Sequence, residues 1–420
     1  MPDPANYADQ QQYSLFGELQ IPVLDNVNIQ AAVRREEFSG GLGATVYKVA
    51  GKWDVWGPLS FRASYGTNYQ APPVGVIPGA QVAAARTYTV AGGNWPGATF
   101  VTDSSITPET ATAMNLGAIW DSQGFAPDHD FRLIVDYFDI ETEDQIGQIA
   151  DPNQIASLVF NGPGGTITTC DPNVNPLVSR ISFNGVCAVG LSGASGFSSV
   201  TTLYGNGPGQ KTNGFDVQAV YSLPLGPGDL TLDFTATQIT ELKTGPTSLD
   251  GVVVSTGDDR LGSLNFATFA LASPELRANL AASYRLDQQS FRLGVNYVSA
   301  VTDERAGIQY GENGEDWITT DFTYRMEVTE DLALTATVAN IFDRMPPKAQ
   351  EELGYDPFMG NPLGRTFEIG VKKSFYPPPR DLRQAATAVC RTFLSGDVRK
   401  AAWPDRRPSS QHIQSGGQGI

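Results

Sequence analysis

Apolar and polar residues alternate with a period of two in many stretches of this 420-residue chain. The clearest stretch is Glu275–Leu286. Its apolar parity comprises Leu276, Ala278, Leu280, Ala282, Tyr284 and Leu286, and its other parity is mostly Arg277, Asn279, Ser283 and Arg285. Because successive side chains of a strand point to opposite faces, the alternation predicts strands that meet an apolar medium on one face and water on the other.

The same pattern predicts thirteen strands. They are Gln12–Pro22, Val27–Phe38, Ala44–Val55, Leu59–Tyr69, Thr112–Trp120, Asp130–Ile146, Asn213–Leu223, Asp229–Glu241, Glu275–Leu286, Ser290–Ala300, Trp317–Val328, Leu332–Phe342 and Arg365–Phe375. The chain also contains 44 Gly and 28 Pro, a share above the usual one, which suits strands and turns better than helices. We therefore expect an all-β fold.

Short and long connections alternate between these predicted strands. The short ones are Val23–Asn26, Trp56–Pro58, Pro224–Gly228, Asp287–Gln289 and Thr329–Asp331, and the long ones are Gln70–Ala111, Gly147–Thr212, Leu242–Pro274, Val301–Asp316 and Arg344–Gly364. Outer-membrane barrels have short periplasmic turns and longer extracellular loops. If the last strand runs down to the periplasm, every short turn is periplasmic, and only Ser39–Gly43 is a short extracellular connection. This alternation of short and long connections predicts an antiparallel transmembrane β-barrel of outer-membrane type.

The most specific motif lies between Asn340 and Phe375. It comprises the letters NIFD, then GYDPFMGNPLGR, then an alternating strand that ends at Phe375. This segment closely resembles the C-terminus of TonB-dependent outer-membrane receptors. Segments beginning at Tyr13, Phe61, Glu109 and Val135 resemble successive barrel strands of the same family, so the resemblance covers nearly all of residues 12–375. One departure is Tyr-Gln-Ala-Pro at 69–72, where the family usually has Phe-Arg-Ala-Pro.

The resemblance implies a 22-stranded barrel whose lumen is filled by an N-terminal plug domain, with a TonB box ahead of the plug. Neither plug nor box is in the sequence, so we expect residues 1–375 to be the last thirteen strands of such a barrel. With an odd number of antiparallel strands the first and last run the same way and cannot close on each other. The resemblance also assigns Phe375 as the terminal signal for barrel assembly. We expect a fragment that is not competent for transport alone.

The charge and the two ends of the chain add further expectations. A net charge of −17 argues against nucleic acid as a partner. The sequence has no apolar run of 18 residues that would predict a transmembrane helix, and its first residues do not resemble a signal peptide. Residues 376–420 contain seven Lys and Arg against three Asp, and we expect a disordered basic tail. The tail is either a recruitment segment or an extension fused beyond the natural stop.

Few residues suggest chemistry. Cys170 and Cys187 bracket a loop rich in Asn, Pro and Gly, so we expect a disulfide, with two unrelated buried thiols as the alternative. Only His129 and His412 exist, which leaves little material for a histidine triad or a metal centre. We expect no catalytic residues, no metal and no cofactor.

One acidic cluster could suggest catalysis. It comprises Asp136, Asp139, Glu141, Glu143 and Asp144. Paired carboxylates can hydrolyse glycosides, and carboxylates can bind calcium. Three of the five share the parity of the lipid-facing residues before them, however, which favours a strand end that extends into water. We do not expect an enzyme.

The polar parity of the strands would line the lumen. Its charged residues include Arg62, Arg132, Arg277, Arg285, Arg292, Arg325, Asp216, Asp233 and Asp321. In the family this wall contacts the plug and the passing ligand; the alternative is that these residues satisfy one another. No ligand residue can be chosen from the set.

The function implied by the resemblance is uptake of a large scarce solute, such as an iron chelate, cobalamin or an oligosaccharide. The expected location is the cell outer membrane. The expected partners are outer-membrane lipid and, in the intact family, the TonB complex. Two alternatives stay open: a porin-like channel without a plug, and a soluble β-rich binding module.

Overall fold

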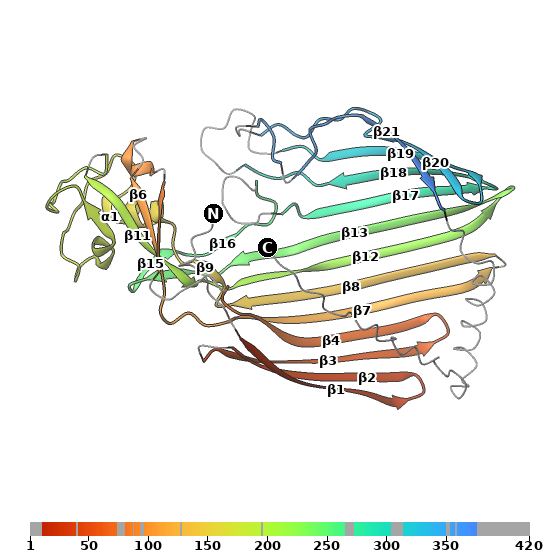
Figure 1. Ribbon diagram of the computed structural model, residues 1–420, viewed down its shortest axis with the longest axis horizontal. Coiled ribbons are helices and arrows are strands. Elements are labelled where there is room, and N and C mark those ends of the chain that lie inside the picture. Colours follow the sequence, from red (N-terminus) through yellow and green to blue (C-terminus); the bar gives the residue numbers. More distant parts are fainter. Residues whose placement is uncertain are drawn as a thin grey trace, which may run out of the picture.

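Long antiparallel strands lie side by side in one sheet that makes up most of the molecule (Figure 1). The computed structural model describes residues 11–38, 41–73, 80–86, 88–92, 96–126, 128–194, 196–264, 273–303, 314–349, 353–357 and 359–375. The strands are β1 (Gln12–Leu24), β2 (Val27–Phe38), β3 (Gly43–Trp56), β4 (Leu59–Gln70), β7 (Glu109–Ala126), β8 (His129–Glu143), β12 (Gln210–Leu225), β13 (Gly228–Thr244), β17 (Leu276–Leu286), β18 (Gln289–Val298), β19 (Trp317–Thr329), β20 (Leu332–Ala339) and β21 (Thr366–Lys373). Their order in the sheet is their order in the chain, and the short strand β16 (Asp258–Asp259) pairs beside β13.

The sheet confirms the predicted fold class, and each of the thirteen predicted strands is present. The largest differences lie at strand ends. Alternation predicted only Thr112–Trp120 for β7, but the strand extends in both directions because register pairs with β8, such as Thr110 with Glu143, continue beyond the alternating part. Hydrogen-bonded pairing therefore carries a strand further than its apolar pattern indicates.

The predicted strand Asp130–Ile146 is wrong at its C-terminal end. β8 ends at Glu143, and Asp144 adopts a positive φ of 55°. Ile146–Gln148 then forms β9, which pairs with a different sheet. The left-handed residue breaks the strand, and Asp is one of the few residues that tolerate this conformation.

The two faces of the sheet differ in polarity, as alternation predicted. Phe234, Leu280 and Val295, for example, lie opposite one another on neighbouring strands. The large apolar side chains exposed on this face include Leu15, Leu19, Tyr47, Val49, Trp53, Phe61, Leu280, Leu293, Ile318, Leu334 and Ile369. Soluble monomers rarely expose an apolar patch of more than about 600 Å². The apolar face is therefore suited to an apolar surrounding.

The strands β1 and β21 are the two edges of the sheet. The pairing runs from one to the other through eleven strands between them and does not join them to each other. Every residue of β1 is exposed, and so are most of those in β21. Because the neighbours are all antiparallel and the count is odd, the two edge strands run in the same direction.

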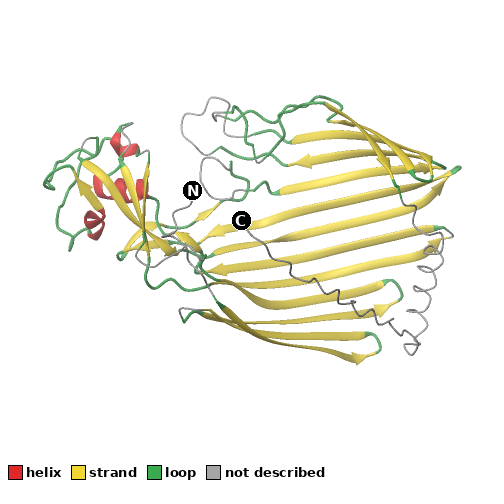
Figure 2. Cartoon of the chain, viewed as in Figure 1, coloured by secondary structure: helices red, strands yellow, loops and turns green. Residues whose placement is uncertain are grey.

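Three of the long connections fold together beside one end of the sheet and form what we call the loop module (Figures 1 and 2). Its elements are β5 (Gln81–Ala85), η2 (Thr89–Ala91) and β6 (Gly97–Thr102) from the first connection; β9, α1 (Pro152–Phe160), η3 (Pro176–Arg180), β10 (Ile181–Phe183) and β11 (Phe197–Asn206) from the second; and the hairpin β14 (Thr247–Leu249) and β15 (Val252–Ser255) from the third. The first two connections share a sheet of order β10-β11-β6-β5, in which β6 and β11 are parallel and β9 lies beside β11. The sequence predicted long loops here and none of these elements.

The loop module has a hydrophobic core of its own, to which all three connections contribute. Tyr88 comes from the first, Phe160 and Phe197 from the second, and Leu249 from the third, and all four are buried. The rings of Phe160 and Phe197 stack with centroids 5.3 Å apart, and Tyr88 meets Phe197 edge to face at 5.2 Å. The three connections are therefore one packed body rather than three separate loops.

The ends of the chain complete the comparison. Phe375 lies two residues beyond the end of β21 and is exposed. The predicted tail 376–420 and Phe358 of the loop motif lie outside the described residues. Among the helices of the described residues, none has the length and apolar character needed to cross a membrane.

Candidate ligand-binding site on the polar face

A groove of about 470 Å³ lies on the polar face of the sheet. It crosses β8, β12, β13, β17 and β18, the strands whose long connections supply two of the three parts of the loop module. Its polar lining residues include Arg62, Asp136, Asp216, Gln218, Asn279 and Asn296. Such convergent carboxylate, amide and guanidinium groups are the kind that orient a bound ligand.

An ion pair at one side of the groove joins β4 and β8 across β7. Arg62 donates from Nε to Oδ1 of Asp136 at 2.9 Å, and its Nη2 contacts the second carboxylate oxygen. Gly117 on β7 lies between the two side chains, where a Cβ would be 2.1 Å from Oδ1 of Asp136. The absence of a side chain at Gly117 is therefore what lets the pair form.

Hydrogen bonds connect further polar side chains along the groove. Thr237 donates from Oγ1 to Asp216 at 2.6 Å. Asn279 donates to Asn296, which in turn donates to Oδ2 of Asp321 at 2.8 Å. Asp216 and Asp321 belong to the predicted lumen set, whereas the two amides were not singled out because they carry no charge. These hydrogen bonds fix the orientation of the polar side chains that line the groove before any ligand arrives.

The other charged residues predicted for this face pair at other levels of the sheet. The ion pairs are Arg292–Asp233 at 3.4 Å, Arg132–Asp121 at 4.0 Å and Arg325–Glu327 at 3.5 Å. Arg285 lies next to the short turn after β17. Mutual pairing therefore accounts for part of the predicted set, whereas Arg62, Arg277 and Asp216 line the groove.

The Asn-Ile-Phe-Asp motif forms the turn after β20. Asn340 has a φ of 51°, and its side chain both donates to the carbonyl of Arg344 at 2.8 Å and accepts from the N–H of Arg344 at 2.9 Å. The N–H of Arg365, just before β21, donates to Asp343 at 2.8 Å. The motif thus joins the beginning and the end of the last connection, which is a structural role rather than a catalytic one.

The acidic cluster that follows Asp136 is divided between the two faces. Asp136 is on the polar face, whereas Asp139 has the opposite parity, accepts a hydrogen bond from Tyr137 at 3.2 Å and lies 4.0 Å from the ammonium of Lys211. His129 is the first residue of β8, and its ring forms a hydrogen bond with the hydroxyl of Tyr221 at 2.8 Å. Within the described part of the chain, no three His, Cys, Asp or Glu residues gather as a metal site.

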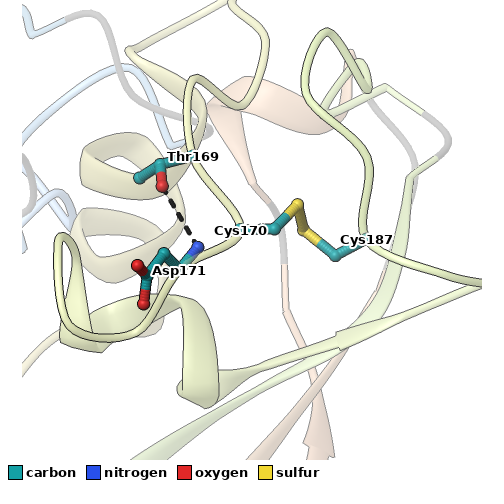
Figure 3. Close-up of a disulfide and its surroundings, with 4 residues drawn as sticks. All are labelled: Thr169, Cys170, Asp171 and Cys187. Atoms are coloured by element: carbon teal, nitrogen blue, oxygen red, sulfur yellow. Dashed lines mark hydrogen bonds between the residues drawn. A yellow bond between two sulfur atoms is a disulfide. The ribbon is translucent and has the colours of Figure 1, made fainter.

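Cys170 and Cys187 form a disulfide in the loop module, with their Cα atoms 5.9 Å apart (Figure 3). Both cysteines pack against the module core. The N–H of Asp171, next to the bridge, donates to the hydroxyl of Thr169 at 3.1 Å. The bridge closes the segment that contains η3 and β10.

An ion pair also joins the second and third connections of the module. Arg180 donates from Nε and Nη2 to the two carboxylate oxygens of Asp250, each at 2.7 Å. These hydrogen bonds lower the pKa of Asp250 from its ordinary value and raise the pKa of Arg180. The pair holds the β14–β15 hairpin onto the end of η3.

Together, the features of the sheet define a class of protein. Thirteen antiparallel strands with one apolar and one polar face, and with long connections at one end, form the wall of an outer-membrane type of β-barrel. The family model described as TonB dependent receptor-like, beta-barrel, matches residues 2–341, and the chain belongs to this family. A search of the curated proteins finds no match.

Several solved structures share the fold. The ferric enterobactin receptor PfeA of Pseudomonas aeruginosa is 16% identical, with a TM-score of 0.59 over 87% of this chain and 45% of that one. The siderophore receptor PirA of Acinetobacter baumannii is 15% identical, with a TM-score of 0.56 over 88% and 46%. The copper transporter OprC is 14% identical, with a TM-score of 0.50 over 87% and 50%. The chain thus spans about half the length of these proteins.

Proposed function

We propose that this chain forms part of the wall of an outer-membrane receptor that takes up a large scarce solute with energy from the TonB complex. The observation that carries the proposal is the sheet of thirteen long antiparallel strands, with its apolar face and its long connections gathered at one end. Outer-membrane lipid would cover the apolar face, since a membrane strand must pair its backbone within the sheet while its side chains meet hydrocarbon.

A metal chelate is the first candidate for the solute. Support comes from the family membership and from the names of the similar structures, which refer to ferric enterobactin, siderophores and copper. The groove on the polar face would contribute the carboxylate of Asp216 as an acceptor and the amides of Asn279 and Asn296 as further hydrogen-bonding groups for the passing solute. Cobalamin and oligosaccharides are the other solutes that the family membership leaves open.

Outer-membrane fractionation tests the location. We expect the protein in the detergent-extracted outer membrane, with migration on a gel that changes on boiling because a folded barrel resists detergent at room temperature. Full solubility without detergent, as a monomer, would contradict the proposal and favour a soluble β-rich binding module. Steady ion conductance in planar bilayers by the purified chain would favour a porin-like channel instead.

Uptake of radiolabelled iron or copper chelates by cells that express the protein tests the solute. We expect Asn279→Ala combined with Asp216→Ala to lower the uptake rate about thirtyfold, since loss of each of the two hydrogen bonds to a ligand costs about 1 kcal/mol. Ser283→Ala, on the same face but outside the groove, is the control. Uptake that is equal in all variants would remove the groove from the solute path.

A further inference from the structure

A second groove, of about 660 Å³, lies on the apolar face of the sheet. It crosses β2, β3, β4, β7, β8 and β12, and its lining residues are apolar except for Lys52, Arg62 and the hydroxyl of Tyr137. The residues of its central row pair in register from strand to strand: Ile29, Gly51, Ala63, Leu116, Tyr137 and Phe215. Arg62 and Gly117 of the polar-face site also line this second groove, whereas none of the residues of its central row lines the polar groove.

Small residues make the floor of the groove, and an aromatic pair lies further along the strands on either side of this floor. Gly51 and Ala63 are direct partners on β3 and β4. On one side of them the rings of Trp53 and Phe61 are 6.3 Å apart. On the other side the ring of Tyr65 is 6.3 Å from that of Tyr47. The depression is therefore built by a change of side-chain size within an otherwise bulky apolar face.

The depth of the groove in a membrane follows from the strand length. Gly51 lies six residues from Gly57 in the short turn after β3, which is about 20 Å of strand at about 3.3 Å per residue. With a strand tilt of about 45°, this gives a depth of about 14 Å, near the middle of an apolar band about 25 Å tall. Only the acyl chain of a lipid reaches this depth, because headgroups stay in the interface.

One end of the groove lies near the short turns. At this end, Val27 is the first residue of β2, next to the short turn before it, and Trp53 lies near the end of β3, close to the short turn after it. Below it, Trp56 and Trp120 meet edge to face with centroids 6.2 Å apart. Aromatic residues concentrate at the level of the headgroups. The groove thus continues the lipid-facing surface from the periplasmic interface to the middle of the membrane.

We propose that this groove holds one acyl chain of a phospholipid from the periplasmic leaflet. The inference rests on the proposed outer-membrane location. Hydrocarbon is as apolar as the groove, so the hydrophobic effect contributes little, and the gain comes from close van der Waals contact with the aromatic walls. A chain seated between the two aromatic pairs makes more contacts than a chain on a flat part of the wall.

Filling the floor tests the proposal. A Cβ at Gly51 meets only the carbonyl oxygen of Asn28, at 3.8 Å, so Gly51→Leu fills the groove with little strain. Gly17 shares the apolar parity on β1 and has nothing within 4 Å of its Cβ, so Gly17→Leu is the matched control. The protein is placed in nanodiscs of phosphatidylethanolamine and phosphatidylglycerol and is analysed by native mass spectrometry.

We expect one phospholipid to remain on the protein and on Gly17→Leu after the other lipids are stripped, and this occupancy to fall about tenfold in Gly51→Leu. Equal occupancy in the two variants overturns the proposal, as does a dimer of the chain that excludes lipid from the groove. Retention of lipid A alone from native membranes also overturns it, because lipid A belongs to the other leaflet. Heat-modifiable migration of all three proteins is measured in parallel. If the migration is normal, absence of a bound lipid counts against this inference only. If the heat-modifiable migration is absent, the proposed outer-membrane location fails too.

Discussion

A single missing side chain at Gly117 controls the ion pair at the side of the polar groove. The pair joins Arg62 and Asp136 across β7, and the carboxylate is almost fully buried. A buried carboxylate without its partner is costly, so the space above Gly117 contributes to stability as well as to the shape of the groove. Sequence alternation placed Arg62 on this face. It could not show that Gly117, on the strand between β4 and β8, leaves room for Arg62 to reach Asp136.

We predict that Gly117→Ala destabilises the folded sheet by about 1–3 kcal/mol, because the new methyl group displaces the carboxylate from the guanidinium. The measurement is the urea midpoint of the heat-modifiable form. Gly294→Ala is the control, since this glycine is on the same face and a Cβ there has open space around it. Equal midpoints for the two variants would show that the pair does not depend on Gly117.

A second prediction at this scale concerns pH. The Arg180 guanidinium lowers the pKa of Asp250, so the stabilisation is fully present above the ordinary value of about 3.9 and is lost as the pH falls through the lowered value. We expect the β14–β15 hairpin to loosen below about pH 4 by about 1 kcal/mol, the usual size of a partly exposed pair. The measurement is hydrogen exchange of residues 247–255, corrected for the intrinsic rate.

Asp250→Asn is the matched variant for this prediction. Asn tolerates the φ of 52° at this position but cannot titrate. We therefore expect it to exchange faster than the parent protein at pH 7 and to show no further step below pH 4. If the parent protein and the variant have the same pH profile, the pair does not hold the hairpin.

At the scale of elements, the loop module depends on contacts between segments that are far apart in the sequence. The disulfide is a covalent constraint on the module, and it joins two cysteines with a sequence separation of 17. We predict that Cys170→Ser destabilises the module by about 3 kcal/mol, the loop-entropy value for this separation. Limited proteolysis within residues 144–209 measures this, and we expect the strands of the large sheet to keep their resistance.

The control for this prediction is Cys390→Ser, which removes a thiol that lies outside the described residues. It should leave the proteolysis rate unchanged. If Cys170→Ser is also cleaved at the parent rate, the core around Phe160 and Phe197 holds the module without the bridge. That outcome would assign the stability of the module to packing.

The elements also show what the sequence could and could not predict. Long strands such as β17 were predicted to within a residue. Each has an apolar face of its own, so the alternation can be recognised within the strand's own residues. The module elements were missed because they are short, and because their core forms only when three connections meet. For α1, the local signals were present: Asp151 caps the helix, Pro152 occupies its first turn, and Asn161 ends it in the left-handed region. The polar-face groove was missed because its lining residues come together only through the register of strands that are far apart in the sequence.

At the scale of the whole molecule, the apolar face is the feature that most needs an explanation. Leu280 lies at the middle of β17 on this face and is half exposed. If the face meets hydrocarbon, a charge there must be desolvated. We predict that Leu280→Arg costs about 2–4 kcal/mol, the usual effect of Arg near the midplane of a membrane barrel. The measurement is the urea midpoint of folding into liposomes.

Thr235→Arg is the control that makes this measurement specific to the membrane. Thr235 is exposed on the neighbouring strand β13 but has the polar parity, directly opposite Asn279. An arginine there reaches water in a lumen, so we expect little change in the midpoint. A soluble β-rich module predicts the reverse order for the two variants, because in water Leu280→Arg would only replace an exposed apolar side chain with a charged one. The order of the two midpoints therefore decides between a membrane wall and a soluble sheet without any knowledge of the solute.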